Sequence, residues 1–182
     1  ELHVTENALP LDNLDANFSV GDALIQADGT RPSWPKVDVI IGNPPFGSQS
    51  LTFQFKPELR GVSIHNQFFR AALDSVRPGG VQALVVSRFL MDAQDKDTRL
   101  ALAKKARLLG AIRLPDTAFK ENARTEVVTD IVFLQKLTEA EQQEMDEAVQ
   151  AYTSRPEKDH RAEHERQQLA AKVPDWVETT SI

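Results

Sequence analysis

The sequence predicts an α/β domain whose sheet is mainly parallel and ends in an antiparallel strand. Up to about Leu137, short β-branched runs alternate with helical patterns, as in βαβ units. The last two of these runs are separated by only about a dozen residues without a helical period, which is too few for a helical crossover. A hydrophobic content of 41% over 182 residues suits one globular domain of ordinary size.

The predicted elements follow one another closely along the chain. A weak β-like run, Asn17–Val20, precedes the nearly all-apolar run Val37–Ile41, which we expect to form a strand covered on both faces. The helix predicted over His65–Val76 has one apolar face, and Pro78-Gly79-Gly80 stops it. The series continues with a strand Val81–Val86, a helix Thr98–Leu109 with Gly110 at its C′ position, a strand Ala111–Leu114, and a strand Val127–Leu134 with an irregularity near Asp130.

Beyond Leu137 the sequence becomes charged, rich in Gln and helical. Two helices are predicted, Glu139–Tyr152 and Pro156–Lys172, and the second is polar almost all round. Residues 138–182 contain eleven Asp/Glu and five Lys/Arg, whereas residues 1–137 contain sixteen of each, so the net charge of −6 lies in this tail. We therefore predict one domain over residues 1–137 and a charged helical extension over residues 138–182.

The overall charge argues against a generally basic nucleic-acid-binding surface. Basic residues nevertheless prevail between Arg88 and Arg124, and this stretch predicts either a solvated helix face or a local phosphate-contacting patch. No apolar run approaches the roughly 20 residues needed to cross a bilayer. Cysteine is absent, which excludes disulfides and thiolate metal sites, so we expect a soluble cytoplasmic protein without a membrane partner.

The residues that indicate chemistry are Asn43-Pro44-Pro45-Phe46, which follow the run Val37–Ile41 and Gly42. In an open parallel sheet, ligands bind beyond the carboxyl ends of the strands, which is where this motif stands. Two consecutive prolines restrict the backbone and keep Asn43 and Pro44 extended. The Pro44 carbonyl oxygen and the Asn43 side-chain oxygen can then both point into a cleft.

Two fixed acceptors suit an exocyclic amine, which has two N–H donors. Accepting both hydrogens favours the pyramidal nitrogen that develops when the amine attacks a methyl group, and so stabilises the transition state. Phe46 offers a face on which an extruded base can stack, and the role of Pro45 is conformational. This mechanism needs neither a metal nor a general base with a shifted pKa, because positioning supplies most of the rate.

The run Asp38–Phe46 resembles motif IV of the N6-adenine-specific DNA methyltransferases, in which Asn/Asp-Pro-Pro-Tyr/Phe holds the target adenine. The similarity covers most of Phe18–Lys136, and large phage, plasmid and restriction-type methylases carry a similar stretch. Gly21-Asp22-Ala23-Leu24 matches the family's acidic position that contacts the adenine of the methyl donor, which implies Asp22 as a donor-binding residue. The resemblance implies an incomplete Rossmann-like class I methyltransferase sheet, S-adenosyl-L-methionine as cofactor, and DNA with a flipped-out adenine as partner.

The sequence departs from this family at the methyl-donor site. No two of its eight glycines form the Gly-x-Gly of motif I, and the acidic residue that binds the donor's ribose has no clear counterpart. In the family's order both precede motif IV, so we expect them upstream of Glu1 and interpret the chain as the catalytic segment of a larger methylase. The hydrophobic sheet edge is then expected to be exposed, or covered by the missing N-terminal segment, by another chain or by the tail.

Two other interpretations remain open. The same tetrapeptide resembles that of methyltransferases acting on guanine N2 in ribosomal RNA and on glutamine in release factors, although Leu114-Pro115-Asp116 followed by Phe119 favours the DNA enzymes. The second interpretation is a non-catalytic interaction fragment of a split methylase, with the acidic tail as its partner surface. Binding of the methyl donor by the chain alone would argue against such a fragment.

The remaining candidate residues are interpreted as structural. The string His160-Arg161-Ala162-Glu163-His164 matches a zinc-peptidase pattern, but its surroundings are charged, and we expect a solvated helix without a metal. His65 and Asn66 are expected as capping or loop residues. Trp34 and Trp176 are expected as packing residues rather than as platforms for bases.

Overall fold

A computed structural model of the 182-residue chain describes residues 34–45, 63–93, 96–118 and 128–178, together with Asp15, Val20, Ala23 and Leu24. The chain divides into two compact units, Glu1–Pro32 and Ser33–Ile182. All helices and strands described below belong to the second unit. The predicted run Asn17–Val20 lies outside the described residues, apart from Val20.

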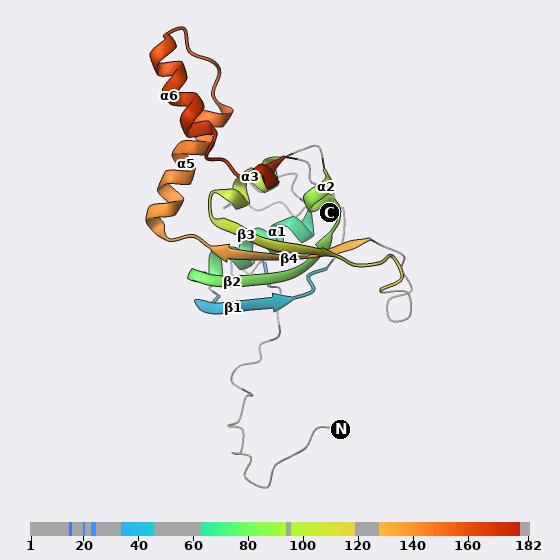
Figure 1. Ribbon diagram of the computed structural model, residues 1–182. Coiled ribbons are helices and arrows are strands. Elements are labelled where there is room, and N and C mark those ends of the chain that lie inside the picture. Colours follow the sequence, from blue (N-terminus) through green and yellow to red (C-terminus); the bar gives the residue numbers. More distant parts are fainter. Residues whose placement is uncertain are drawn as a thin grey trace. The chain divides into compact units, whose positions relative to one another are not determined.

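Strands and helices alternate in the first part of this unit, and its last part is helical (Figure 1). The elements in chain order are β1 Val37–Gly42, α1 Ile64–Ser75, β2 Val76–Ser87, α2 Phe89–Asp92, α3 Asp97–Ala103, β3 Ala106–Arg113, β4 Thr129–Lys136, α5 Glu139–Thr153, α6 His160–Ala170 and the 3-10 turn η3 Asp175–Val177.

The four strands form one mixed sheet in the order β1-β2-β4-β3. β1 runs parallel to β2, with Gly42 opposite Leu84, and β4 lies antiparallel between β2 and β3. The antiparallel last strand that the short connection predicted is therefore confirmed. Only one of the three ladders among the described strands is parallel, however, so the sheet is mixed rather than mainly parallel as the sequence predicted. β1, β2 and β3 all point the same way, so their carboxyl ends share one edge of the sheet.

The core lies on the face of the sheet that α1, α2 and α3 cover (Figure 1). Gln82 is fully buried on this face and donates a hydrogen bond from Nε2 to the Phe69 carbonyl oxygen at 3.1 Å, which ties β2 to α1. Trp34 and Trp176 pack against the core, as predicted. Each fully buried large apolar side chain contributes roughly 1.5–3 kcal/mol. The main ones are Phe69, Leu73, Leu84, Val86, Leu90, Met91, Leu102, Val132 and Leu134.

The opposite face of the sheet is apolar, and none of the described helices covers it. Val39, Ile41 and Ile112 on this face are 56%, 80% and 54% exposed. Because Val39 and Ile41 are exposed, the prediction that Val37–Ile41 would be covered on both faces is wrong. β-branched residues favour an extended backbone but do not determine what packs against each face. Among the described residues β1 pairs only with β2, so its other side agrees with the expectation of an exposed hydrophobic edge.

Pro78, Gly79 and Gly80 lie inside β2, although the sequence predicted them only as a helix stop. α1 does end before them, at Ser75. Between Val37 and Val39 of β1, however, β2 advances from Val76 to Val81, so these residues form a bulge. Gly79 has a φ of 80°, which favours glycine. The Arg77 guanidinium closes the bulge with an ion pair to Asp38 at 2.9 Å.

The helix predicted over Thr98–Leu109 is shorter in the structure. α3 ends at Ala103 and β3 already begins at Ala106. Gly110 pairs with Phe133 of β4 inside the sheet, so its prediction as a helix C′ residue is wrong. Ala, Leu and Lys favour a helix here, but pairing with β4 and burial of Ala106 outweigh this weak local preference.

The tail consists of α5 and α6, which pack against each other, and of η3, which contacts α3 (Figure 1). α5 begins with a capping box. Glu141 N donates to Thr138 Oγ1 at 3.3 Å, and Thr138 N donates to Glu141 Oε2 at 2.8 Å. α6 has no buried residue, as its polar sequence predicted. The tail and the sheet belong to one compact unit. The domain boundary between residues 137 and 138 stays a prediction.

Candidate active site

The candidate site begins where β1 ends. Gly42 is the last residue of β1, and Asn43-Pro44-Pro45 leave the sheet at the edge where the parallel strands have their carboxyl ends. Asn43 and Pro45 are exposed, and Pro44 is half-buried. No cis peptide bond occurs among the described residues, so the bonds that precede both prolines are trans. The sequence predicted this placement from the apolar run that precedes the motif.

The Asn43 side chain is available to a ligand. It makes no hydrogen bond to any described residue and it is exposed, so its oxygen can accept a hydrogen bond from a donor outside the chain. Pro44 and Pro45 have no N–H, and their φ angles are restricted, so the short segment has few alternative conformations. Such a segment can present one amide oxygen and one carbonyl oxygen to a single nitrogen that carries two hydrogens.

The end of β2 lies beside the end of β1 and is followed by two exposed residues, of which the sequence indicated only Arg88, as part of the basic stretch. Ser87 is followed by Arg88 and Phe89, which are both exposed. The Arg88 guanidinium lies 5.1 Å from the centre of the Phe89 ring. The Arg88 N–H donates to the Val128 carbonyl oxygen at 3.3 Å, just before β4 begins. The signals in the sequence were the basic stretch that begins at Arg88 and a large aromatic residue, Phe89, two positions after a buried strand.

A partly buried ion-pair network joins the ends of β3 and β4. Arg113 donates from Nε to Asp130 Oδ1 at 2.8 Å and from Nη2 to Asp130 Oδ2 at 3.1 Å. Its Nη2 also reaches Asp92 Oδ1 of α2 at 2.9 Å. Asp130 is fully buried, and its hydrogen bonds, followed by those of Asp92, raise the pKa of Arg113 above the usual value. The network holds this edge of the sheet together, and it explains why β4 continues without interruption through Asp130.

Two predicted site residues cannot be placed. Phe46 and Asp22 lie outside the described residues, so stacking by Phe46 and donor contact by Asp22 stay predictions. Four glycines are described, Gly42, Gly79, Gly80 and Gly110, and all four lie in strands. The described residues therefore fit the amine half of a methyl-transfer site and provide no glycine turn that could cradle a methyl donor.

The described basic residues between Arg88 and Arg113 do not form a continuous patch of unpaired charges, and Lys120 and Arg124 of the predicted patch lie outside the described residues. Most of the basic side chains are neutralised by carboxylates. Lys96, Lys104 and Arg107 pair with the tail residues Glu178, Asp146 and Glu141 at 2.9, 3.2 and 2.9 Å. Lys105 pairs with Asp74, and Arg99 is buried. Carboxylates of the acidic tail thus neutralise three of the positive charges in the basic stretch.

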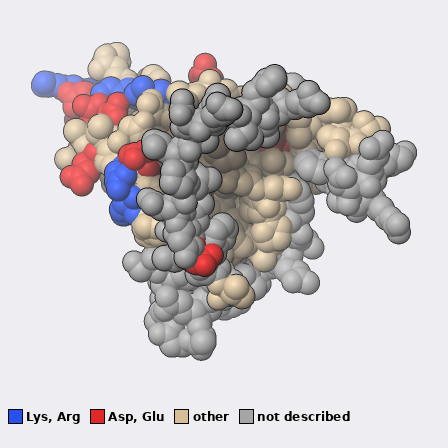
Figure 2. All heavy atoms as spheres, turned by 90° about the horizontal axis from the view of Figure 1, so that it is seen from below, with Lys and Arg blue, Asp and Glu red and all other residues tan. Residues whose placement is uncertain are grey.

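The exposed charges show the same mixture on the face seen from below in Figure 2. Blue and red side chains lie next to one another toward one side of the face, and most of the described surface elsewhere on it is uncharged. No broad basic area is visible among the described residues on this face. Recognition of a polyanion by the described part of this face would therefore depend on a few individual side chains.

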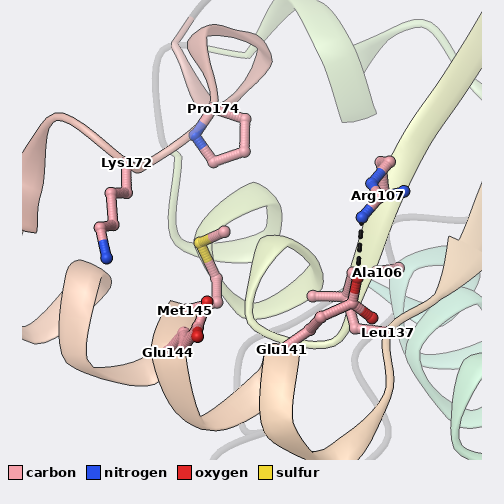
Figure 3. A pocket seen from close by; sticks show the side chains of 8 residues that line it. All are labelled: Ala106, Arg107, Leu137, Glu141, Glu144, Met145, Lys172 and Pro174. Carbon is pink, nitrogen blue, oxygen red and sulfur yellow. Dashed lines mark hydrogen bonds and ion pairs between the residues drawn. The ribbon is translucent and has the colours of Figure 1, made fainter.

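A pocket of about 240 Å³ lies at the other end of the sheet. Its lining includes Arg107 near the start of β3, Leu137 after β4, and Met145 of α5 (Figure 3). The ion pair between Arg107 and Glu141 crosses one side of it. β3 begins here and ends at the edge that carries Asn43, so this pocket does not belong to the candidate site.

The zinc-peptidase-like string lies on exposed α6. Glu163 is bound to Arg166, with Nη2 to Oε1 at 2.7 Å, and this hydrogen bond is the main reason why the pKa of Glu163 falls to about 2. His164 Nε2 is 3.0 Å from Gln168 Nε2. These contacts fit the interpretation of a charged, solvated helix. His65 and Asn66, expected as capping or loop residues, lie in the first turn of α1, with Ser63 at the N-cap position.

The fold and this edge define a mixed α/β domain that carries an Asn-Pro-Pro segment at the carboxyl end of a parallel strand. The sequence matches the model of the N-6 DNA methylase family over residues 9–179. The chain therefore belongs to the N-6 DNA methylase family, whose members use S-adenosylmethionine. None of the helices in the described part of the chain is both long and apolar enough to cross a membrane.

Several known proteins are similar to parts of this chain. Defense against restriction protein B of Escherichia phage P1 is 35% identical over 101 residues, which is 54% of this chain and 4% of that protein. The M protein of the type I restriction enzyme EcoKI is similar in structure, with a TM-score of 0.49, 27% identity, and coverage of 66% of this chain and 24% of that chain. A protein assigned as the modification subunit of a type I restriction enzyme from Vibrio vulnificus has a TM-score of 0.49, 24% identity, and coverage of 56% and 23%.

Proposed function

We propose that this chain holds the target amine while a methyl group is transferred to N6 of adenine in DNA. The observation that carries the proposal is the position of Asn43 and Pro44 in a member of the N-6 DNA methylase family. Both follow the last residue of β1, and the Asn43 side chain is exposed and unbonded to the described residues. The chain spans a small part of the relatives it matches, so the activity belongs to a larger methylase.

The proposed mechanism assigns one task to each residue of the motif. Asn43 Oδ1 and the Pro44 carbonyl oxygen each accept one hydrogen of the adenine amine. This turns the nitrogen lone pair toward the incoming methyl group and stabilises the developing positive charge. Pro45 restricts the backbone, and Phe46 stacks on the extruded base. The amine loses its proton to solvent after the transfer, so no side chain has to act as a base.

The methyl donor is assigned mainly to other parts of the protein. S-adenosylmethionine, when bound, supplies an electrophilic methyl group. Asp22 is the one residue of this chain that we propose as a contact, to the adenine of the donor. This division of labour rests on the sequence, in which no two glycines form the Gly-x-Gly of motif I.

The substitution Asn43→Ala in the full-length methylase tests the assignment. We expect methyl transfer to duplex DNA to fall roughly 100-fold or more, the usual effect of removing one group that stabilises a developing charge. The measurement is incorporation of labelled methyl groups, with mass spectrometry of the nucleosides to identify N6-methyladenine. Asn43 is exposed, so thermal unfolding of the variant should match that of the unsubstituted protein.

Asn43→Asp is the matched variant, because a carboxylate oxygen can still accept the amine hydrogen. It should recover a substantial part of the activity that Asn43→Ala loses. Wild-type rates in Asn43→Ala would contradict the mechanism. Methylation of guanine N2 in RNA, or of a glutamine-containing peptide, in place of DNA would contradict the assignment of adenine in DNA as the substrate.

Calorimetric titration of the 182-residue chain with S-adenosylhomocysteine tests the proposed donor contact. Micromolar binding that Asp22→Ala abolishes would support a donor site within this chain. Absence of binding would show that the donor is held elsewhere. It would also favour the view that the isolated chain is an interaction fragment, and activity would then have to be measured on the full-length protein.

A further inference from the structure

Phe89 is a large apolar side chain held outside the core by a firmly anchored helix. It is 60% exposed, whereas its neighbours Leu90 and Met91 are 2% and 1% exposed. Two buried or half-buried contacts fix α2 further, because Arg99 donates to the Leu90 carbonyl oxygen at 3.0 Å and Asp92 binds Arg113. The exposed ring therefore stands on a rigid support.

Arg88 supplies a positive charge beside this ring. Its guanidinium lies 5.1 Å from the ring centre, within the range of a cation–π contact. In contrast to Lys96, Lys104 and Arg107, it has no carboxylate partner among the described residues. Its charge is thus left for a ligand, although most of the basic stretch is neutralised.

The pair stands next to the proposed target-base site. β1 and β2 are parallel with Gly42 opposite Leu84, and Pro45 and Ser87 are each three residues further along. Arg88 and Phe89 follow Ser87 directly. The pair therefore belongs to the same sheet edge as Asn43 and Pro44, one strand away.

An exposed aromatic face with an arginine over it suits a nucleotide. The base can stack on the ring, and the guanidinium can bind a phosphate oxygen. We propose that Arg88 and Phe89 form a stacking site for a nucleotide of the DNA strand that carries the target base. The identification of the ligand as DNA rests on the proposed function, whereas the site itself rests on the exposure and charge of the two residues.

Fluorescence anisotropy of the 182-residue chain with a labelled single-stranded DNA of about 12 nucleotides at low salt tests this site. Phe89→Ala should weaken binding roughly 5- to 150-fold, the range found when one stacked base loses its aromatic partner. Arg88→Gln should weaken binding. It should also reduce the slope of log affinity against log salt concentration by the amount expected for the loss of about one phosphate contact. Each variant is compared with a control of the same residue type or character.

The controls are Leu109→Ala and Arg107→Gln. Leu109 is 53% exposed on β3, and Arg107 is already paired with Glu141, so both variants should bind within about twofold of the unsubstituted chain. The stacking site is overturned if Phe89→Ala binds as tightly as Leu109→Ala, or if the unsubstituted chain does not bind the DNA. Tighter binding of RNA of the same sequence would overturn the assignment to DNA.

Asn43→Ala separates this proposal from the proposed function. If Asn43→Ala kept methyl transfer while Phe89→Ala lost DNA binding, the mechanism at Asn43 would fail and the stacking site would stand. If Asn43→Ala abolished methyl transfer while Phe89→Ala bound the DNA normally, the mechanism at Asn43 would stand and the stacking site would fail.

Discussion

Asp130 and Arg113 show how single residues set the geometry of the site edge. Asp130 is fully buried in β4. The Arg113 guanidinium donates hydrogen bonds to both carboxylate oxygens of Asp130 and to one carboxylate oxygen of Asp92. A buried carboxylate is tolerated only when it is paired and hydrogen-bonded. This network joins β3, β4 and α2 at the edge to which Asn43 also belongs.

Arg113→Met removes the cation and keeps most of the side-chain volume. We expect a loss of about 3 kcal/mol in the free energy of unfolding, because Asp130 would be left buried without its partner. The exposed pair of Arg107 with Glu141 is the control, and Arg107→Met should cost less than about 1 kcal/mol. Urea unfolding measures both values. Equal effects would mean that the buried network has no special role.

At the scale of elements, the bulge in β2 determines how β1 attaches to the sheet. A Cβ atom at Gly80 would lie 2.5 Å from the Asp38 carbonyl oxygen and 2.8 Å from Val76 Cγ1. Only glycine permits this close approach between the two backbones. Since β1 is the edge strand that carries Asn43, the bulge also positions the candidate site.

Gly80→Ala should therefore displace β1. Overpacking of this kind costs roughly 1–3 kcal/mol, which should appear as a lower midpoint of urea unfolding. Amide hydrogen exchange in β1 should become faster as well, because the strand is held on one side only among the described residues. The matched control is Gly110→Ala in β3, where an added Cβ would meet nothing within 4 Å. A stable Gly80→Ala protein with unchanged exchange in β1 would contradict this role.

At the scale of the whole molecule, the charged tail is attached to the sheet domain by specific contacts. Arg99 is buried in α3 and donates from Nε to the Val177 carbonyl oxygen at 2.7 Å. Lys96 binds Glu178 at 2.9 Å, and Val177 packs in a second small core with Leu100 and Val149. These contacts join residues that the sequence placed in two separate parts.

Truncation of the chain after Val173 tests whether the tail is part of the fold. The guanidinium of Arg99 would lose its Val177 acceptor, and Trp176 and Val177 would no longer cover the core. We expect a loss of at least about 3 kcal/mol in the free energy of unfolding. Arg99→Met in the full chain should cost less, because it replaces the buried charge with an apolar side chain. An unchanged unfolding midpoint after truncation would favour an independent extension.

The sequence alone determined the α/β class, the antiparallel direction of the last strand and the placement of Asn43-Pro44-Pro45 after β1. It could do so because these features depend on local patterns, namely β-branched runs, a short connection and the restricted backbone of consecutive prolines. The end of α1 at Ser75 and the start of α5 at Glu139 also lie within one residue of the predicted positions.

Only the tertiary structure decided which face of each strand is covered, where α3 gives way to β3, and which basic residues keep an unpaired charge. The exposure of Val39 and Ile41, the strand at Ala106–Gly110 and the neutralisation of Lys96, Lys104 and Arg107 all depend on partners far away in the sequence. The free energies of pairing and burial outweigh local propensities of a few tenths of a kcal/mol per residue. The exposure of Phe89 and the lack of a carboxylate partner for Arg88 among the described residues were likewise not predictable, because both are properties of the folded chain.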